Sequence, residues 1–350
     1  WLRATAWCRG SRGFPAASKS ITWRNAERSI RPNCFGTAWK IRKEGLFVDT
    51  IRVIGYYPLP PFVVAQENGF FAREGLQNEF TIATLAPEHN KGMLDGRWDI
   101  SLTSPDTMVA RVTRDGHEFL LYLMAERGLE VKLIGAKGIK APAQLRGETL
   151  AGDPGDSNYD LHRRKILRAH GVGESDYAVK IIGTSPFRLE ALRRGEVAAC
   201  MLAPPYDGQA LSEGFNLLAT GAEHIPNYAT TACWARSAWV TAHRDKMLRF
   251  VRAFVAGADW VLDPLNRQEA VDLVAAYSKI SRAQAETKLA QVTPKAAIVP
   301  EDLNRVIQLR IEMGFYDPPH VAVERFYDAN IWCEATGLPL PKPFGLPRVI

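Results

Sequence analysis

The chain has 350 residues, of which 46% are hydrophobic and 23% charged, and its formal net charge is +6. This composition is typical of a globular protein and excludes a disordered or fibrous chain, and the length favours two domains over a single core. The positive charge is concentrated in residues 1–49, which hold ten Lys and Arg against three acids, so the rest of the chain carries about −1. A nearly neutral body excludes the electrostatic reason to expect a nucleic acid partner.

Residues 1–49 are interpreted as a basic leader that is disordered or foreign to the folded body. The leader has no continuous apolar stretch of the length that an export signal needs, and its Arg-rich, acid-poor composition is similar to that of a transit peptide. No run of about 18 apolar residues occurs later, so no membrane-spanning helix is predicted.

From residue 51 onward the pattern alternates between strands and helices. The apolar run 51–57 predicts a buried strand, the prolines after it predict the start of a helix over about 62–73, and 79–84 predicts a second strand. A short helix near 90–94, strands at 99–104 and 119–125, and a helix starting near 105 follow in order. This alternation predicts an α/β lobe with a mostly parallel sheet.

A second α/β unit is expected after the apolar strand at 130–136. Strands are predicted at 148–152, 177–183, 197–202 and 215–220, with helices between them. Beyond about residue 230 the apolar residues recur every three to four positions, which is typical of amphipathic helices. These helices need a sheet to cover. The Pro-rich stretch 336–350 is expected to be an extended tail.

Four segments carry a resemblance to a known family. They are PPFVVAQENGFFAREGL, DGRWDISLTSPD, QLRGETLAGDPGDSNYDLHRRKILRAHGV and ALRRGEVAACMLAPPYD. In order and spacing they resemble the substrate-binding proteins of nitrate, sulfonate and taurine type ABC transporters, over about residues 51–330.

The resemblance implies a type II periplasmic binding protein fold, with two lobes, a central ligand cleft and two hinge crossings of the chain. It places the first lobe at 50–136 plus 232–335 and the second at 137–231. It also implies a ligand between the lobes, at the carboxyl ends of strands, which is where an open α/β sheet binds ligands on physical grounds.

Four turns follow a predicted strand and open a predicted helix, whose free N–H groups attract ligand oxygens. Each turn also has a purely structural interpretation, as a stiff turn or a helix cap. Trp234, where the chain returns to the first lobe, is a further candidate. The predicted ligand-binding residues are Tyr56, Pro58, Leu59, Thr103, Ser104, Asp153, Asp156, Ser157, Asn158, Pro205, Tyr206 and Trp234.

None of the four turns contains Arg or Lys, which argues against a dedicated cation clamp for a strongly anionic ligand. A neutral, aromatic or weakly anionic solute fits this pattern better. Together with the resemblance, this gives the expectation of a small organic solute that is sulfonate-like, aromatic or carboxylate-like. The cysteines at 200, 233 and 333 are far apart and form no CxxC pair, so they are interpreted as buried and inert.

No catalytic signature is found. GxSxG, HExxH and GxxxxGK[ST] are absent, and the seven histidines do not pair at metal spacing, so we interpret them as surface or capping residues. The alternative is a cytosolic enzyme on the same fold, either a thiamine-pyrimidine synthase-like protein or a decarboxylase. The first of these is disfavoured because the chain has ATTACWARSAW where a CCCFC-type run is expected.

The sequence therefore predicts a solute receptor that catalyses nothing and needs no cofactor or metal. The resemblance implies a membrane permease as its partner, a monomeric state and a periplasmic location. A native start without an export signal would place it in the cytoplasm instead.

Overall fold

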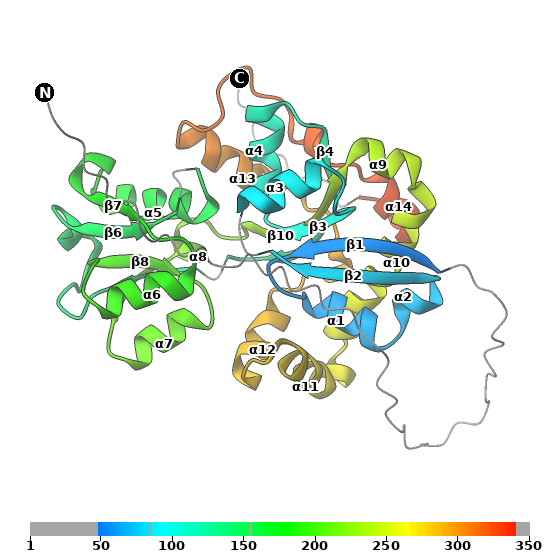
Figure 1. Cartoon of the computed structure of the whole chain (residues 1–350), viewed down its shortest axis with the longest axis horizontal. Coiled ribbons are helices and arrows are strands. Elements are labelled where there is room, and N and C mark those ends of the chain that lie inside the picture. The colour runs from blue at the N-terminus through cyan, green and yellow to red at the C-terminus, as the bar shows by residue number, and fades with distance from the viewer. Residues whose placement is uncertain (1–47, 84–85, 130, 154–155, 341–350) are drawn as a thin grey trace, which may run out of the picture.

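The computed structural model describes residues 48–340, except 84–85, 130 and 154–155. The expected leader up to residue 47 and the last ten residues of the expected tail lie outside the described residues. The described strands form two five-stranded sheets, one in each of two lobes that lie side by side (Figure 1). The two-lobed α/β fold that the sequence predicts is confirmed.

The first sheet has the strand order β2-β1-β3-β10-β4. β1 is parallel to β2 and β3, whereas β10 is antiparallel to β3 and β4, so β10 alone runs against the other four. The strands are β1 (Asp49–Gly55), β2 (Leu76–Ile82), β3 (Ile100–Thr103), β4 (Phe119–Arg127) and β10 (Ala229–Arg236).

The second sheet repeats this design with the order β7-β6-β8-β5-β9. β6 is parallel to β7 and β8, and β5 is antiparallel to β8 and β9. The strands are β5 (Lys132–Gly135), β6 (Thr149–Gly152), β7 (Ala178–Ile181), β8 (Ala199–Leu202) and β9 (Asn216–Thr220). Both sheets are mostly parallel, as predicted.

The chain passes between the sheets twice. It leaves β4 and enters β5 through residues 128–131, and it returns through residues 225–228 into β10. β5 pairs with β8 and β9, so its residues, which the expected limit at 136 assigned to the first lobe, belong to the second sheet. The apolar sequence of β5 fits either sheet equally, and only the pairing decides between them.

The helices of the first lobe include nearly all of the C-terminal part of the chain. α1, α10 and α14 pack together on one side of the lobe, whereas α4 and α13 lie on the side toward the second lobe (Figure 1). The helices are α1 (Pro60–Glu67), α2 (Phe70–Arg73), α3 (Ala86–Leu94), α4 (Pro105–Asp115), α9 (Ser237–Ala242), α10 (Arg244–Leu262), α11 (Arg267–Ser278), α12 (Arg282–Ala290), α13 (Pro300–Glu312) and α14 (Asn330–Thr336). The predicted amphipathic helices thus cover the first sheet.

The second lobe has fewer helices, and short 3₁₀ helices lie in both lobes. The α-helices are α5 (Asn158–Ala169), α6 (Ser185–Arg193), α7 (Tyr206–Ser212) and α8 (Gly221–His224). The 3₁₀ helices are η1 (Pro142–Leu145), η2 (Glu174–Asp176), η3 (Pro264–Asn266), η4 (Pro294–Ala296) and η5 (Val323–Phe326). None of the described helices has both the length and the apolar character needed to cross a membrane.

Close packing of α1 against α10 fixes the frame of the first lobe. Phe62 of α1 contacts Phe71, whose ring stacks on Phe250 of α10 with centroids 5.3 Å apart. Gly257 allows the helix backbones to approach, because a Cβ atom there would lie 2.2 Å from the Pro61 carbonyl oxygen. The turn after β1 enters α1 directly, so this packing also positions that turn.

Candidate ligand-binding site

The four predicted turns all lie at carboxyl ends of parallel strands. β1 and β3 are parallel neighbours in the first sheet, and β6 and β8 in the second, so two turns meet at one edge of each sheet. Arg310 of α13 bridges the two edges, because it bonds both Asp106, just after β3, and the Asp156 carbonyl, just after β6. We call the region between them the interlobe site; it comprises Tyr56, Tyr57 and Glu126 of the first lobe and Asp153, Tyr159 and Arg188 of the second.

Tyr56 is the most exposed of the predicted ligand-binding residues. It is 43% exposed, yet the protein around its hydroxyl raises the pKa to about 12, by desolvation first and then through Tyr159 and Asp153. A hydrogen bond with Thr107 has the opposite effect. The hydroxyl of Tyr56, after β1, is therefore within electrostatic reach of Asp153 and Tyr159, which lie at the turn after β6.

Arg188 positions the second-lobe side of the site. Its guanidinium is buried and donates to Asp153 Oδ1 at 2.5 Å, to the Met201 carbonyl at 3.0 Å and to the Gly183 carbonyl. The same group lies 5.2 Å from the centre of the Tyr159 ring. Arg188 thus fixes both the carboxylate and the aromatic ring that face Tyr56.

Sequence reasoning missed Arg188 and Tyr159. Arg188 lies inside α6, one turn beyond its start, so a search limited to the four turns finds no cation. Tyr159 follows the predicted turn directly as the second residue of α5. An arginine in the first turns of a helix that follows a strand was the available signal.

Ser157 and Asn158 close the turn after β6. The Ser157 hydroxyl donates to Asp153 Oδ2 at 3.1 Å and accepts from the Asp160 N–H at 3.2 Å, so it caps α5 and orients the turn. Asn158 is half-buried, and its Oδ1 has no hydrogen-bond partner among the described residues. Pro154 and Gly155 lie outside the described residues.

Asp156 contributes to the contact between the lobes, a role that the sequence did not predict, and its contact with a ligand stays a prediction. Its carboxylate pairs with Arg114 of α4, lies 3.6 Å from Arg310 of α13 and 4.0 Å from Arg111. Arg310 is 1% exposed and is itself held by Asp106 at 2.7 Å. With three guanidinium groups around it, Asp156 serves the contact between the lobes.

Thr103 and Trp234 lie below the surface, and their contact with a ligand stays a prediction. Trp234 is 0% exposed, and its indole N–H donates to Thr103 Oγ1 at 3.0 Å. Thr103 also pairs with Ser101 at 2.7 Å, and Ser101 pairs with His89 at 2.9 Å. The sequence places these residues at the right strand ends, but their side chains point into the lobe.

Two histidines are also more deeply buried than expected. His89 lies 6.3 Å from Tyr56, centroid to centroid, and His162 lies 4.5 Å from Tyr228. Desolvation lowers the pKa of each to about 4, so both are neutral at pH 7. The prediction that histidines lie on the surface or cap helices is therefore wrong for these two.

The remaining predicted residues have mixed surroundings. Ser104 caps α4 by accepting from the Asp106 N–H at 3.3 Å, and Leu59 is fully buried beneath the β1 turn, so neither side chain is free for a ligand. Pro58, Pro205 and Tyr206 are half-buried. For these three, ligand contact stays a prediction.

A second unexpected cluster links the two crossings. Glu126 of β4 is 0% exposed, and its Oε2 accepts from the Tyr57 hydroxyl at 2.6 Å and from the Thr231 hydroxyl of β10 at 2.8 Å. Burial and this carboxylate raise the pKa of Tyr57 well above its usual range. Lys288 lies 3.6 Å from the centre of the Tyr57 ring. No local pattern indicates this cluster, because its members are far apart in the chain.

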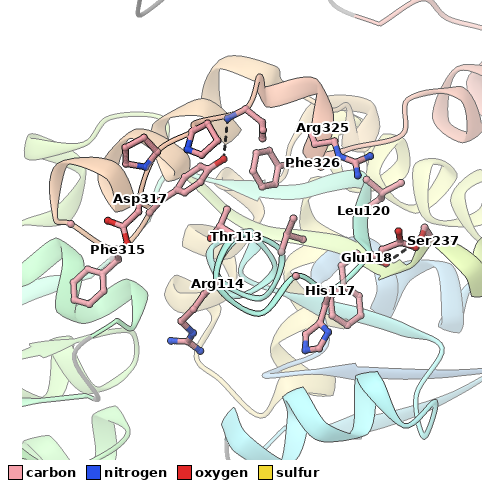
Figure 2. Close-up of a pocket in the computed structure, with 18 residues that line it drawn as sticks. Thr113, Arg114, His117, Glu118, Leu120, Ser237, Phe315, Asp317, Arg325 and Phe326 are labelled. Carbon is pink, nitrogen blue, oxygen red and sulfur yellow. Dashed lines mark hydrogen bonds between the residues drawn. The ribbon is translucent and has the colours of Figure 1, made fainter.

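A hollow of about 800 Å³ lies elsewhere, between the end of α4, the start of β4 and residues 314–326 (Figure 2). Its lining includes Arg114, His117, Glu118, Asp317 and Arg325, and none of the predicted ligand-binding residues. In Figure 2 Arg114 extends from α4 toward the second lobe, in agreement with its ion pair to Asp156. Because its cations and acids are mixed and its polar groups do not converge, the hollow is a weaker candidate than the interlobe site.

Comparison with known proteins identifies the family and the fold. Residues 59–266 match the family described as NMT1/THI5 like. The chain belongs to the NMT1/THI5-like family. It is also 27% identical over 296 residues to the bicarbonate transport ATP-binding protein CmpC of Synechocystis sp., a match that covers 77% of this chain but only 43% of that protein.

Three solved structures share the fold. The nitrate-binding protein NrtA from Synechocystis PCC 6803 has a TM-score of 0.67 and 14% identity, covering 83% of this chain and 89% of its own. The alkanesulfonate-binding protein SsuA from Xanthomonas axonopodis pv. citri has a TM-score of 0.65 and 14% identity, and the match covers 79% of this chain and 97% of SsuA. The desulfurization enzyme DSZB has a TM-score of 0.64 and 15% identity, and the match covers 83% of this chain and 99% of DSZB. The resemblance to nitrate and sulfonate binding proteins is confirmed, and the fold also occurs in an enzyme.

Proposed function

We propose that this protein is the solute-binding receptor of an ABC-type uptake system and closes its two lobes over a small organic solute. The observation that carries the proposal is the pair of facing turns: Tyr56 from the first lobe and Tyr159 with Asp153 from the second. Such a solute would contact both lobes and so stabilise the closed arrangement. The two short crossings provide the hinge.

The proposal has further parts, which concern the lobes, the partner, the oligomeric state and the location. The lobes are residues 50–131 with 229–335, and residues 132–228. The partner is a membrane permease that recognises the closed form, the receptor acts as a monomer, and it works in the periplasm. A transport role is supported by the similarity to NrtA and SsuA, which bind nitrate and alkanesulfonates, and to CmpC, a bicarbonate transport protein.

We propose binding without turnover, even though DSZB shares the fold. Cys200 and Cys233 are buried, and burial raises the pKa of Cys200 to about 12 and that of Cys233 further. Neither thiol is therefore ionised at neutral pH, so neither serves as a nucleophile. His89 is already committed to Ser101 inside the lobe.

The test is a thermal-shift screen of sulfonates, nitrate, bicarbonate, carboxylates, aromatic acids, amines and pyrimidines, with calorimetry and mass spectrometry of each hit. A true ligand stabilises the protein by about 2.7 kcal/mol at a hundredfold excess over its Kd. Its scattering radius of gyration should fall on binding. Consumption of the hit with release of product would overturn the receptor proposal in favour of an enzyme.

Variants locate the site. Tyr56→Ala and Tyr159→Ala should each weaken binding about tenfold, since each removes an aromatic face from one lobe. Leu265→Ala, at a residue that is 93% exposed on η3, is the control and should leave affinity unchanged. Equal affinity in all three variants would place the ligand outside the interlobe site.

A further inference from the structure

Building on the proposed function, we propose that Glu126 selects the solute by accepting a hydrogen bond from an N–H group on it. The solute class is then an amine, amidine or amide-bearing organic molecule with a planar part between the tyrosines. This differs from the oxyanions named for NrtA and SsuA.

Glu126 lies where the ligand and the hinge meet. It is the penultimate residue of β4, just before the first crossing, and its partner Thr231 lies in β10, just after the second. Its other partner, Tyr57, directly follows Tyr56 in the turn after β1 and is close enough to Tyr159 of the second lobe for the two to interact electrostatically. A solute held between Tyr56 and Tyr159 would therefore lie beside the tyrosine that bonds this carboxylate.

The carboxylate of Glu126 is not fully satisfied. Both hydroxyl groups donate to Oε2, whereas Oε1 is buried and has no hydrogen-bond partner among the described residues. None of the ion pairs of residues 48–340, the unplaced positions aside, includes Glu126. A buried carboxylate without a cation is costly, so a donor brought by a ligand is strongly favoured there.

Most of the nearby cations are paired with other carboxylates. The pairs are Arg127 with Asp302, Arg188 with Asp153, Lys132 with Asp207, and Arg310 with Asp106. The exception is Lys288, which lies on the Tyr57 ring and makes no direct ion pair with Glu126. An oxyanion at Glu126 would face a carboxylate with no cation paired directly to it. The charge balance therefore favours a donor over an anion.

Access to Oε1 requires movement. The atom is buried in this structure, and the Tyr57 hydroxyl bonds to the other oxygen of the same carboxylate. Opening of the lobes separates Tyr57 from Tyr159, and the solute N–H reaches Oε1 as the lobes close again. Selection thus takes place during closure.

Four probes with one ring and different polar groups test the proposal: benzamidine, benzamide, benzoate and benzenesulfonate. Binding to the full chain is measured by ligand-observed NMR and calorimetry. Benzamidine and benzamide should bind, in a manner that Tyr56→Ala weakens, and the two anions should not. Binding of either anion in preference to the N–H probes, with the same Tyr56 dependence, would overturn the role of Glu126 and leave the receptor proposal standing.

Glu126→Gln is the decisive variant. Its amide oxygen still accepts from Tyr57 and Thr231, but its NH₂ replaces the free oxygen and repels an N–H probe. Benzamidine should bind about ten- to a hundredfold more weakly. Glu79→Gln, at an exposed position of β2, is the matched control and should bind as the unmodified chain does.

The second variant guards against a folding defect. Glu126→Asp keeps the charge but shortens the side chain by one methylene. It should therefore weaken the binding of every N–H probe and leave the order of their affinities unchanged. Unchanged benzamidine affinity in both Glu126 variants, each with an unaltered melting temperature, would refute the inference. Failure of every probe and every screened metabolite to bind the unmodified chain would refute the receptor proposal as well.

Discussion

Replacing Arg310 with Met tests whether a buried ion pair inside the first lobe, next to the contact with the second lobe, stabilises the protein. Arg310 is 1% exposed and donates to Asp106 Oδ1 at 2.7 Å and to the Asp156 carbonyl of the second lobe at 3.3 Å. Asp106 is 2% exposed. The substitution keeps an unbranched side chain but leaves the Asp106 carboxylate buried without its cation.

The expected loss is large because the remaining charge stays buried. Breaking one side of a buried pair costs about 3–5 kcal/mol. Arg305→Met on the same helix is the matched control: Arg305 is 35% exposed, and its partner Asp302 keeps Arg127 at 2.8 Å. That control should cost about 1 kcal/mol or less.

The loss should depend on pH with a defined sign. Burial already raises the pKa of Asp106, and Arg310 opposes that rise. Without Arg310 the pKa in the folded state rises further above its unfolded value, so folding becomes coupled to proton uptake. Stability then falls as the pH rises from the unfolded pKa to the folded one. The variant is therefore expected to lose more stability at pH 8 than at pH 5.

Urea unfolding at both pH values, followed by tryptophan fluorescence, measures these differences. Adding Asp106→Asn to the Arg310→Met chain should restore part of the stability at pH 8, because no charge is then left buried. A loss below 1 kcal/mol for Arg310→Met, or the same loss at pH 5 and pH 8, would refute the assignment of a buried charge pair.

Two further outcomes are expected from the fold. Gly257→Ala should destabilise the protein by about 1–3 kcal/mol in urea, because its Cβ would lie 2.2 Å from the Pro61 carbonyl oxygen. Gly208→Ala, in α7 with no atom within 4 Å of the new Cβ, should be neutral or slightly stabilising, and equal losses would contradict the packing argument. Because burial lowers the pKa of His89 and His162 to about 4, stability is full above pH 6.5 and is lost as the pH falls toward 4. The loss is about 3 kcal/mol per histidine at pH 4, and His89→Gln should remove the contribution of His89 to this pH dependence. Histidine NMR titrations with midpoints near 6.5 would disprove the burial.

The sequence located most secondary structure and the turns because these depend on local patterns. Apolar runs such as 51–57 and 119–125 predicted β1 and β4, and Ser104 before a proline predicted the start of α4. The limit of the first lobe at 136 was wrong, since β5 is a short apolar strand whose sheet is decided by pairing with β8 and β9.

Side-chain direction and long-range partners decided the rest. Periodicity and turn chemistry put Tyr56 and Asp153 at strand ends, and the resemblance indicated that those ends face each other. Nothing local shows that Trp234 points inward to Thr103, or that Arg188 reaches back from α6 to Asp153. Glu126, Tyr57 and Thr231 are brought together only when the two crossings lie side by side.

By itself, therefore, the sequence determined the α/β lobes, the family resemblance and the positions of the strand ends, because alternating apolar patterns and helix-start residues act within a few positions. Tertiary structure alone decided which polar groups are left unsatisfied. A carboxylate such as Glu126 becomes an acceptor with a free oxygen only once burial has removed water and the neighbouring cations have been paired elsewhere.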